Sequence, residues 1–223
     1  MKNDTLDYLR KNLDFWDKLN PAEQQALSAS VEWKKYSTGQ NVHSASHECV
    51  GVLLIKSGEL RTYIMSEDGR EITLFRVSAG EVCILSASCI LQSISFDVFV
   101  DAVSDTEVLI IGASCFAKLM EQNVHAENFS LKAAAELFSE VMWTMEQILF
   151  MSFDKRLAIF LLDETSRTGS GTFALTHEQI AKYMGSAREV VSRMLKYFEK
   201  EGLVRLSRGT VEVINKEKLR TMA

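Results

Sequence analysis

One short stretch of this chain carries two helix-start signals ten residues apart. Thr176 is followed three positions later by Gln179, and Ser186 is followed three positions later by Glu189. Each pair fits a capping box, in which a hydroxyl accepts from a free backbone N–H and the acid or amide accepts from the cap residue's own N–H. Two helices are therefore expected to begin near Thr176 and Ser186. Gly185 can supply the left-handed turn between them.

Both expected helices have one apolar face. At three- and four-residue spacing the first repeats Ile180, Ala181 and Met184, and the second repeats Val190, Val191, Met194, Leu195 and Phe198. Packing these faces together leaves a polar, partly basic face on the second helix. That outward face contains Arg188, Glu189, Ser192, Arg193 and Lys196.

This arrangement indicates a helix-turn-helix, in which the start of the second helix reaches base edges in the major groove of DNA. On spacing alone, a plain helical hairpin with a solvated charged face is the alternative. The residues after Gly202 favour the first interpretation. Two short alternating apolar runs there flank Ser207-Arg208-Gly209, which is typical of a β-hairpin. A hairpin directly after the second helix makes a winged helix.

At these residues the chain resembles the Crp/Fnr family of bacterial transcription factors, whose recognition helix opens with Ser-Arg-Glu-Thr/Val-Val-x-Arg. Here the motif reads Ser186-Ala-Arg-Glu-Val-Val-Ser-Arg193. The resemblance implies a sequence-specific regulator that reads bases with Arg188, Glu189 and Arg193. Arg can contact guanine bidentately and Glu can accept from cytosine N4, which agrees with that role. Ser192, Lys196, Thr176 and His177 complete the predicted DNA-binding set, as phosphate-contact candidates.

The distribution of charge supports contact between DNA and one part of the chain. Residues 154–223 contain 13 Lys and Arg against 9 Asp and Glu, a net charge of +4. Since the whole chain carries −5, residues 1–153 carry −9. An acidic module joined to a basic one predicts that nucleic acid meets only the second.

The residues before position 125 predict a β-rich sensor domain. Helical patterns over residues 6–30 break at Asn20-Pro21, where Pro21 fits the first turn of a new helix capped by Asn20. From Trp33 to Ile111 the period changes to two, with strands expected at residues 52–55, 60–64, 72–75, 98–100 and 108–111. Turns about ten residues apart indicate a sandwich or jelly roll. The predicted fold class is thus α+β: a jelly-roll β-barrel like the family's cyclic-nucleotide-binding domain, a long helix, and a winged helix-turn-helix.

The helical pattern returns after residue 126 with apolar residues on two faces. Leu131, Ala134, Phe138, Val141, Met145 and Ile148 recur at heptad-like spacing, with Leu137, Met142 and Leu149 on a second stripe. The alternative is a single helix buried in one domain. With the family resemblance, we expect the first stripe to be a dimer interface. A homodimer would place two helix-turn-helix units about 34 Å apart on a two-fold DNA site.

A hinge is expected at Phe153-Asp154, where Asp154 can cap the next helix. The predicted domains are residues 1–125 for the sensor, 126–152 for the dimerisation helix and 153–223 for the winged helix-turn-helix. No run approaches the roughly 18 apolar residues of a membrane span, and the first residues do not form a signal peptide. A soluble, cytoplasmic protein is expected. The resemblance further implies RNA polymerase as a partner and no membrane.

The effector pocket departs from the family pattern. Cyclic-AMP-binding members carry Gly-Glu-Leu and then an Arg-Ser pair, whereas this chain has Ile84-Leu85 and Ser95-Phe96-Asp97 at those places. No arginine lies between Arg76 and Arg156. A cyclic phosphate would lose its charge partner, so we predict that cyclic AMP is not the ligand. The pocket candidates are Cys83, Ile84, Leu85, Ser86, Ser88 and Cys89.

The four cysteines leave several alternatives open. Members with an iron–sulfur cluster use a tight group of N-terminal cysteines, and this chain has none before Cys49, so such a cluster is not expected. Cys83 and Cys89 allow a thiol redox pair, a haem or metal site, or small buried hydrophobes, the commonest state of a free Cys. His43, His47 and Cys49 are metal-ligand types at a weakly specific spacing, and no metal site is predicted.

Two other classes of protein are alternatives to an effector-controlled regulator. A cupin-type enzyme shares the jelly roll but needs a convergent His/Glu cluster, and this barrel has only His43 and His47 before His125. No catalytic residue is predicted. A ligand-independent DNA binder, with the barrel serving only to hold the dimer, fits the apolar Ile84-Leu85 replacement. A response of DNA affinity to a small molecule or to thiol oxidation would separate the alternatives.

Overall fold

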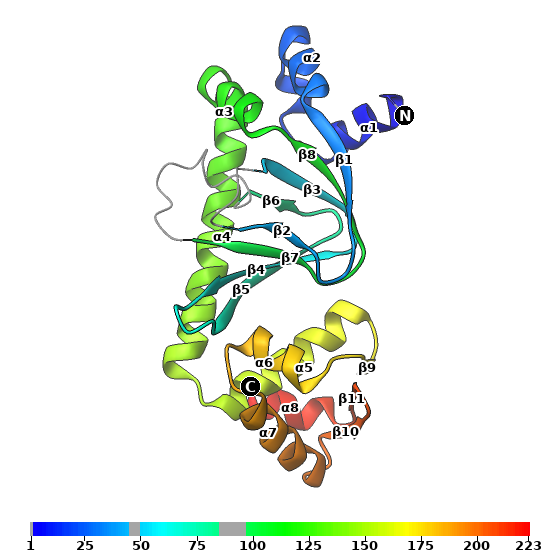
Figure 1. The fold of residues 1–223 in the computed structure, drawn as a ribbon, viewed down its shortest axis with the longest axis vertical. Coiled ribbons are helices and arrows are strands. Elements are labelled where there is room, and N and C mark those ends of the chain that lie inside the picture. The colour runs from blue at the N-terminus through cyan, green and yellow to red at the C-terminus, as the bar shows by residue number, and fades with distance from the viewer. Residues whose placement is uncertain (1, 45–49, 85–96) are drawn as a thin grey trace. The chain divides into compact units, whose positions relative to one another are not determined.

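A computed structural model describes residues 2–44, 50–84 and 97–223. The chain forms two compact units, one comprising Met1–Met65 with Leu74–Val141 and the other Ser66–Thr73 with Met142–Ala223 (Figure 1). The first unit is β-rich and the second is mainly helical. The two units share the long helix α4, Val124–Phe150.

The first unit begins with α1 (Lys2–Asn12), the short 3-10 helix η1 (Trp16–Lys18) and α2 (Pro21–Ala29). The predicted break at Asn20-Pro21 is confirmed, with Pro21 at the first helical position. Asn20 Oδ1 accepts from the backbone N–H groups of Ala22 and Glu23 at 2.9 and 3.0 Å, and Glu23 accepts in turn from the Asn20 N–H. This complete capping box fixes the start of α2.

The described β-strands of the jelly roll form two four-stranded antiparallel sheets (Figure 1). The first sheet has the order β1 (Val31–Tyr36), β8 (Thr106–Ile111), β3 (Val52–Ser57) and β6 (Val82–Cys83). The second sheet has the order β2 (Asn41–His43), β7 (Phe99–Ala102), β4 (Glu59–Met65) and β5 (Glu71–Ser78). Four of the five predicted strands lie within these elements, and the remaining one, residues 98–100, begins one residue before β7, which starts at Phe99. Strands β1, β2 and β6 are additional to the prediction.

Strands β3 and β8 of the first sheet are buried on both faces, which explains the unbroken apolar run Val-Leu-Leu-Ile in β3. On one face lies a helix-side core, which includes Leu9, Phe15, Leu27, Val52, Leu54, Leu109, Ile111 and Phe116. On the other face, between the two sheets, lies an inter-sheet core, which includes Tyr36, Leu53, Ile55, Leu60, Leu74, Val77, Cys83, Val100, Val108 and Ile110. Successive residues of β3 and β8 alternate between the two cores, as the pleat requires.

Helices α3 (Ala113–Gln122) and α4 follow the last strand of the jelly roll. Phe129 and Ala133 of α4 pack against the helix-side core, and Val141 packs against the inter-sheet core. Leu137 contacts both cores. The first half of α4 is therefore part of the β-rich unit, joined to it through one apolar face.

The second unit contains α5 (Phe153–Thr168), β9 (Thr172–Phe173), α6 (His177–Met184), α7 (Arg188–Lys200), β10 (Val204–Ser207), β11 (Thr210–Val213) and α8 (Lys216–Met222). The wing is a three-stranded sheet in the order β10, β11, β9. The predicted hairpin is confirmed, while β9 and α8 were not anticipated from the sequence.

The predicted role of Asp154 as a helix cap is wrong. Helix α5 begins at Phe153, and Ser152 occupies the N-cap position. Asp154 lies in the first helical turn, where the Ser152 hydroxyl donates to its carboxylate and lowers the pKa of that group. A carboxylate there is also favoured by the positive end of the helix dipole. The break after α4 lies at Met151-Ser152, two residues before the predicted hinge.

Candidate nucleic-acid interface and sensor core

Helix α6 starts and ends as its sequence predicts. Gln179 N–H donates to Thr176 Oγ1 at 3.2 Å, and the Thr176 N–H donates to Gln179 Oε1 at 2.8 Å, so the first capping box is confirmed. Gly185 follows the helix with φ 57°, in the left-handed region. The Ser186 N–H then donates to the Ala181 carbonyl at 2.9 Å and closes the turn.

The predicted second capping box is wrong. Helix α7 begins at Arg188, its N-cap residue is Ala187, and no side chain caps it. Ser186 is one residue too early, because its backbone completes the C-terminal turn of α6. Glu189 is instead an acidic residue in the first turn of α7, which the helix dipole favours.

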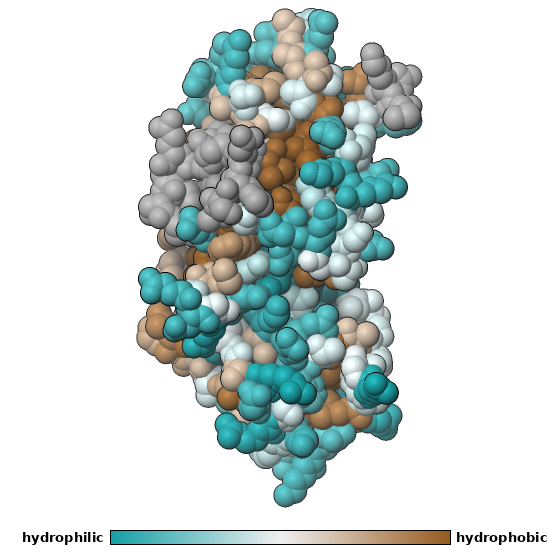
Figure 2. All heavy atoms as spheres, viewed as in Figure 1, coloured by the Kyte–Doolittle hydropathy of each residue, from teal (hydrophilic) through white to brown (hydrophobic). Residues whose placement is uncertain are grey.

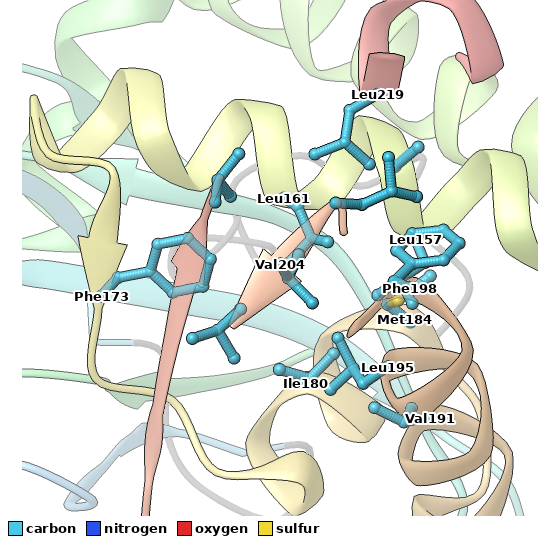
Figure 3. Packing of buried hydrophobic residues seen from close by; sticks show 14 of the residues in the cluster. Leu157, Leu161, Phe173, Ile180, Met184, Val191, Leu195, Phe198, Val204 and Leu219 are labelled. Atoms are coloured by element: carbon cyan, nitrogen blue, oxygen red, sulfur yellow. The ribbon is translucent and has the colours of Figure 1, made fainter. Parts of the chain in front are cut away.

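The two helices are held by a winged-helix core to which every helix and strand from α5 to α8 contributes (Figure 3). Ile180 and Met184 of α6 meet Val191, Leu195 and Phe198 of α7 in this core, as their spacing predicts. Leu157 and Leu161 of α5, Phe173 of β9, Val204 of β10, Val211 of β11 and Leu219 of α8 also belong to it. The three apolar residues of α7 are fully buried. At roughly 1.5–3 kcal/mol for each large side chain, their burial holds the orientation of the helix.

This packing turns the opposite face of α7 outward. Arg188, Glu189, Ser192, Arg193 and Lys196 together line one shallow hollow of about 420 Å³. All are exposed except Ser192, which is half-buried. The structure thus brings together the five residues predicted for the second helix. Three cations and one carboxylate on one helical face provide donors and an acceptor suited to base edges and phosphates.

A second hollow of about 430 Å³ lies between the start of α6 and the wing. It is lined by Leu175, Thr176, His177, Glu178 and Arg188, and by the wing turn Ser207–Thr210. Arg188 lines both hollows and so joins the face of α7 to the wing. Arg208 was missing from the predicted site. Its signal in the sequence was a basic residue at the tip of a hairpin, next to Gly209.

Partial burial and the positively charged surroundings lower the pKa of His177. Its pKa lies below the ordinary value of 6.5, first because of partial burial and then because of the positive charges of Arg188 and Lys196. The neutral imidazole is therefore favoured in the absence of an anion. A phosphate close to His177 would oppose both effects, since a negative charge favours the protonated ring.

The predicted dimer stripe on α4 divides into exposed and packed residues. Leu131, Phe138, Met145 and Ile148 are 59, 66, 46 and 37 % exposed in the single chain. Ala134 and Val141 are half-buried, and Val141 contacts the inter-sheet core. Met142 and Leu149, one helical turn from Phe138 and Met145, are also exposed. Apolar surface of this extent in a water-facing helix is typical of a protein interface, and brown apolar surface lies along the left edge of Figure 2, where the lower part of α4 runs.

Two of the six effector-pocket candidates lie in the described part of the chain. Cys83 is on β6 and fully buried in the inter-sheet core, whereas Ile84 belongs to the helix-side core. The two residues therefore face opposite sides of the first sheet and do not line one pocket. Cys83 is the last residue of strand β6. Leu85, Ser86, Ser88 and Cys89 lie outside the described residues.

The possible redox and metal residues are only partly described. Cys83 and Cys115 form no disulfide among the described residues. His43 is buried on β2, while His47, Cys49 and Cys89 lie outside the described ranges. Within those ranges no group of three His, Cys, Asp or Glu side chains is placed to hold a metal ion. No helix in the described ranges is long and apolar enough to span a membrane.

A jelly roll, a long helix with an apolar stripe and a winged helix with a basic recognition face define one class of protein, the DNA-binding transcription regulators with an attached β-rich domain. The comparisons agree with this architecture. Residues 155–222 match the Crp-like helix-turn-helix domain, and residues 33–123 match the cyclic nucleotide-binding domain. The chain belongs to the Crp/Fnr family of transcriptional regulators.

The similarity to individual relatives spans nearly the whole chain. A crystal structure of a Crp/Fnr family protein from Eubacterium rectale is 44 % identical, covers 95 % of this chain and 98 % of its own, and superposes with a TM-score of 0.91. The cyclic AMP receptor protein of Thermus thermophilus is 28 % identical over 87 % of this chain and 89 % of its own. The fumarate and nitrate reduction regulatory protein of Escherichia coli is 26 % identical over 92 % and 84 %, respectively.

Proposed function

We propose that this regulator is a homodimer that reads a two-fold symmetric DNA site through α7 and responds to a small-molecule signal held in the jelly roll. The observation that carries the proposal is the outward face of α7, where Arg188, Glu189, Ser192, Arg193 and Lys196 line a single hollow. We assign base reading to Arg188, Glu189 and Arg193, and phosphate contact to Ser192 and Lys196. Thr176, His177 and Arg208 border the adjoining hollow and join the phosphate-contact set.

The organisation of the chain supports this assignment. We infer a sensor domain at residues 1–125, a dimerisation helix at 126–152 and a DNA-binding domain at 153–223. The net charge of +4 on residues 154–223 against −9 on the remainder favours contact between DNA and the last domain alone. The exposed apolar stripe of α4 would bring two such domains together, one for each half-site. We propose RNA polymerase as a further partner of the DNA-bound dimer.

Cyclic AMP does not fit the described part of the jelly roll as its signal. Arg61 is the only buried Lys or Arg among the described residues of the first unit. Its neighbours Leu60 and Thr62 point into the inter-sheet core, so Arg61 points to the opposite face of its strand. Among the described residues, a cyclic phosphate would therefore find no buried guanidinium or ammonium group in the core. Calorimetric titration of the dimer with cyclic AMP tests this, and low-micromolar binding would overturn it.

The base-reading assignment can be tested with paired variants of α7. A preferred DNA site is first selected from a random pool, and affinities are then measured by fluorescence anisotropy at fixed salt. Arg193→Ala should weaken the selected site by roughly 1–3 kcal/mol and relax the preference at one base pair. Lys196→Ala should weaken selected and random DNA alike.

Lys200→Ala is the matched control, since Lys200 is an exposed cation at the end of the same helix that does not line the hollow. It should leave both affinities close to those of the wild type. Unchanged base preference in Arg193→Ala would show that the base-reading assignment is wrong. An effect of Lys200→Ala equal to that of Lys196→Ala would show that the contact is only general charge attraction.

A further inference from the structure

A row of side chains crosses three strands of the second sheet and faces the interior of the jelly roll. His43 of β2 is opposite Val100 of β7, and Val100 is opposite Thr62 of β4. Residues directly opposite each other in antiparallel strands share a face of the sheet. Val100 lies in the inter-sheet core. His43 and Thr62 therefore project into the same core.

Two buried hydroxyl groups of this interior have no hydrogen-bond partner in the part of the chain that the structure describes. Thr62 is fully buried, and its Oγ1 makes no hydrogen bond within the described residues. Tyr36, at the end of β1, is 3 % exposed, packs in the inter-sheet core, and likewise has a buried hydroxyl oxygen without a partner among the described residues. Burying a hydroxyl without a partner is unfavourable, and native proteins satisfy nearly all such groups. Two of them in one core indicate a molecule that supplies the missing partners.

The surroundings of these hydroxyls restrict the kind of molecule. Apart from His43, Thr62 and the Tyr36 hydroxyl, the described side chains of this core are apolar, with Leu53, Leu60, Leu74, Val98 and Val100 among its members. A buried anion or cation would need an opposite charge to offset its loss of hydration. Arg61 points to the other face of the sheet and lies over the Tyr63 ring, 4.3 Å from its centroid. The core thus suits an uncharged guest with an apolar body and one or two hydrogen-bonding groups.

The same core contacts the dimerisation helix. Leu137 and Val141 of α4 pack against it, and Phe138, next to Leu137, is among the exposed residues of the predicted dimer stripe. A guest that fills or reshapes the core would change the support beneath this part of α4. Occupancy of the jelly roll and the position of α4 are therefore linked through direct packing.

We propose that the jelly roll binds an uncharged, largely apolar small molecule that hydrogen-bonds to Thr62 and Tyr36, and that this molecule is the signal for the regulator. The inference rests on the proposed function only in taking the jelly roll as the sensor. Binding of a small molecule to the core can be measured without DNA, so failure of this inference can be distinguished from failure of the proposed DNA-binding function.

Three naphthalene compounds serve as probes for calorimetric titration of the full-length protein. 1-Naphthol is neutral and can hydrogen-bond, naphthalene is neutral and cannot, and 1-naphthalenesulfonate is an anion. We expect 1-naphthol to bind roughly two- to tenfold more tightly than naphthalene, the range set by one neutral hydrogen bond. The sulfonate should bind at least tenfold more weakly than 1-naphthol. Absence of 1-naphthol binding, or tighter binding of the sulfonate, would overturn the proposal even if the protein binds its DNA site normally.

Variants then assign the hydrogen bonds. Thr62→Val and Tyr36→Phe remove the two hydroxyls with little change of volume, and at least one of them should abolish the preference for 1-naphthol over naphthalene. Neither should lower the melting temperature of the free protein, because each removes a buried group without a partner. If both variants keep the preference, or if both are less stable than the wild type, the hydroxyls have another role and the proposal is wrong.

Thr106→Val is the matched control. Thr106 is 2 % exposed on β8, but its hydroxyl is paired: Oγ1 accepts from the Glu59 N–H at 3.1 Å and lies 2.8 Å from the Ser104 carbonyl. This variant should lower the melting temperature and keep the preference for 1-naphthol. Loss of the preference in Thr106→Val as well would show that any change in the roll disturbs binding, which would overturn the assignment to Thr62 and Tyr36.

Discussion

Phe138 offers a direct test of the dimer that we propose. In the single chain 66 % of this residue is exposed, on a stripe of α4 shared with Leu131 and Met145. A Phe side chain has about 150–250 Å² to bury, so roughly 100–165 Å² per protomer remains for a partner helix. At about 25 cal/mol per Å² this corresponds to roughly 2.5–4 kcal/mol.

Truncation to Ala removes most of that surface, and we take roughly 2 kcal/mol per protomer as the expected loss. A two-fold axis applies the change twice, because the same patch is used on both subunits. The dimer dissociation constant of Phe138→Ala should therefore rise by roughly a thousandfold, about 4 kcal/mol. Ala is the best helix former, so the helix itself should persist. Sedimentation equilibrium over a range of protein concentrations measures the change.

Trp143→Ala is the control for this experiment. Trp143 is also an exposed aromatic residue, 45 % accessible, but at about 100° per residue it lies on a different face of α4 from Phe138. Its truncation should leave the dissociation constant nearly unchanged. An unchanged constant in Phe138→Ala, or an equal effect of Trp143→Ala, would refute the assignment of the interface to this stripe.

Two further predictions concern the DNA-binding unit. Thr176→Ala removes the hydroxyl that accepts from the Gln179 N–H, which should cost about 1 kcal/mol and raise hydrogen exchange of the first α6 amides about fivefold. Ser186→Ala should change exchange at the start of α7 little, because no side chain caps that helix, and equal effects of the two variants would contradict the observed start of α7. The pKa of His177 is lowered by burial and by the charges of Arg188 and Lys196. The free energy of unfolding should therefore decrease as the pH falls. Since the unfolded chain takes up its proton near pH 6.5 while the folded chain still resists it, stability should be lost through and below that value. In urea titrations at several pH values, the wild type should lose more stability than His177→Gln as the pH is lowered from 7 to 5.5, and parallel curves would contradict the lowered pKa.

The DNA-binding unit was largely predictable because its signals are local. The Thr176-Gln179 capping box, the turn at Gly185 and the apolar spacing of α7 depend on residues within a few positions of one another. Because the apolar residues of α7 occupy its buried face, Arg188 and Arg193 must lie on the outer face. The cap at Ser186 was misassigned because two motifs compete for one residue. Its N–H closes α6, and a sequence pattern does not show which motif wins.

Most of the described strands of the wing and of the jelly roll were predictable from the sequence. Which side chains lie next to one another in them was not. The hairpin at Arg208-Gly209 is evident in the sequence, yet its placement beside His177 and Arg188 follows only from packing. Likewise Cys83 and Ile84 are neighbours in the chain but belong to different cores. Cys83 ends β6, which borders a sheet with a core on each face, so two neighbours in the chain reach different cores.

The sequence by itself determined the order of the modules, the helix-turn-helix and the residues on its outer face, since periodicity and caps act between residues close in the chain. The tertiary structure decided what lies inside the jelly roll. Between Asn41 and His43 the register of β2 against β7 shifts, which places His43 opposite the buried Val100. With strict alternation along the strand, His43 would lie on the same exposed face as Asn41. The register shift places it on the buried face instead. The burial of Thr62 beside this row depends on pairing between strands about 40 to 60 residues apart, and such pairing leaves no local pattern in the chain.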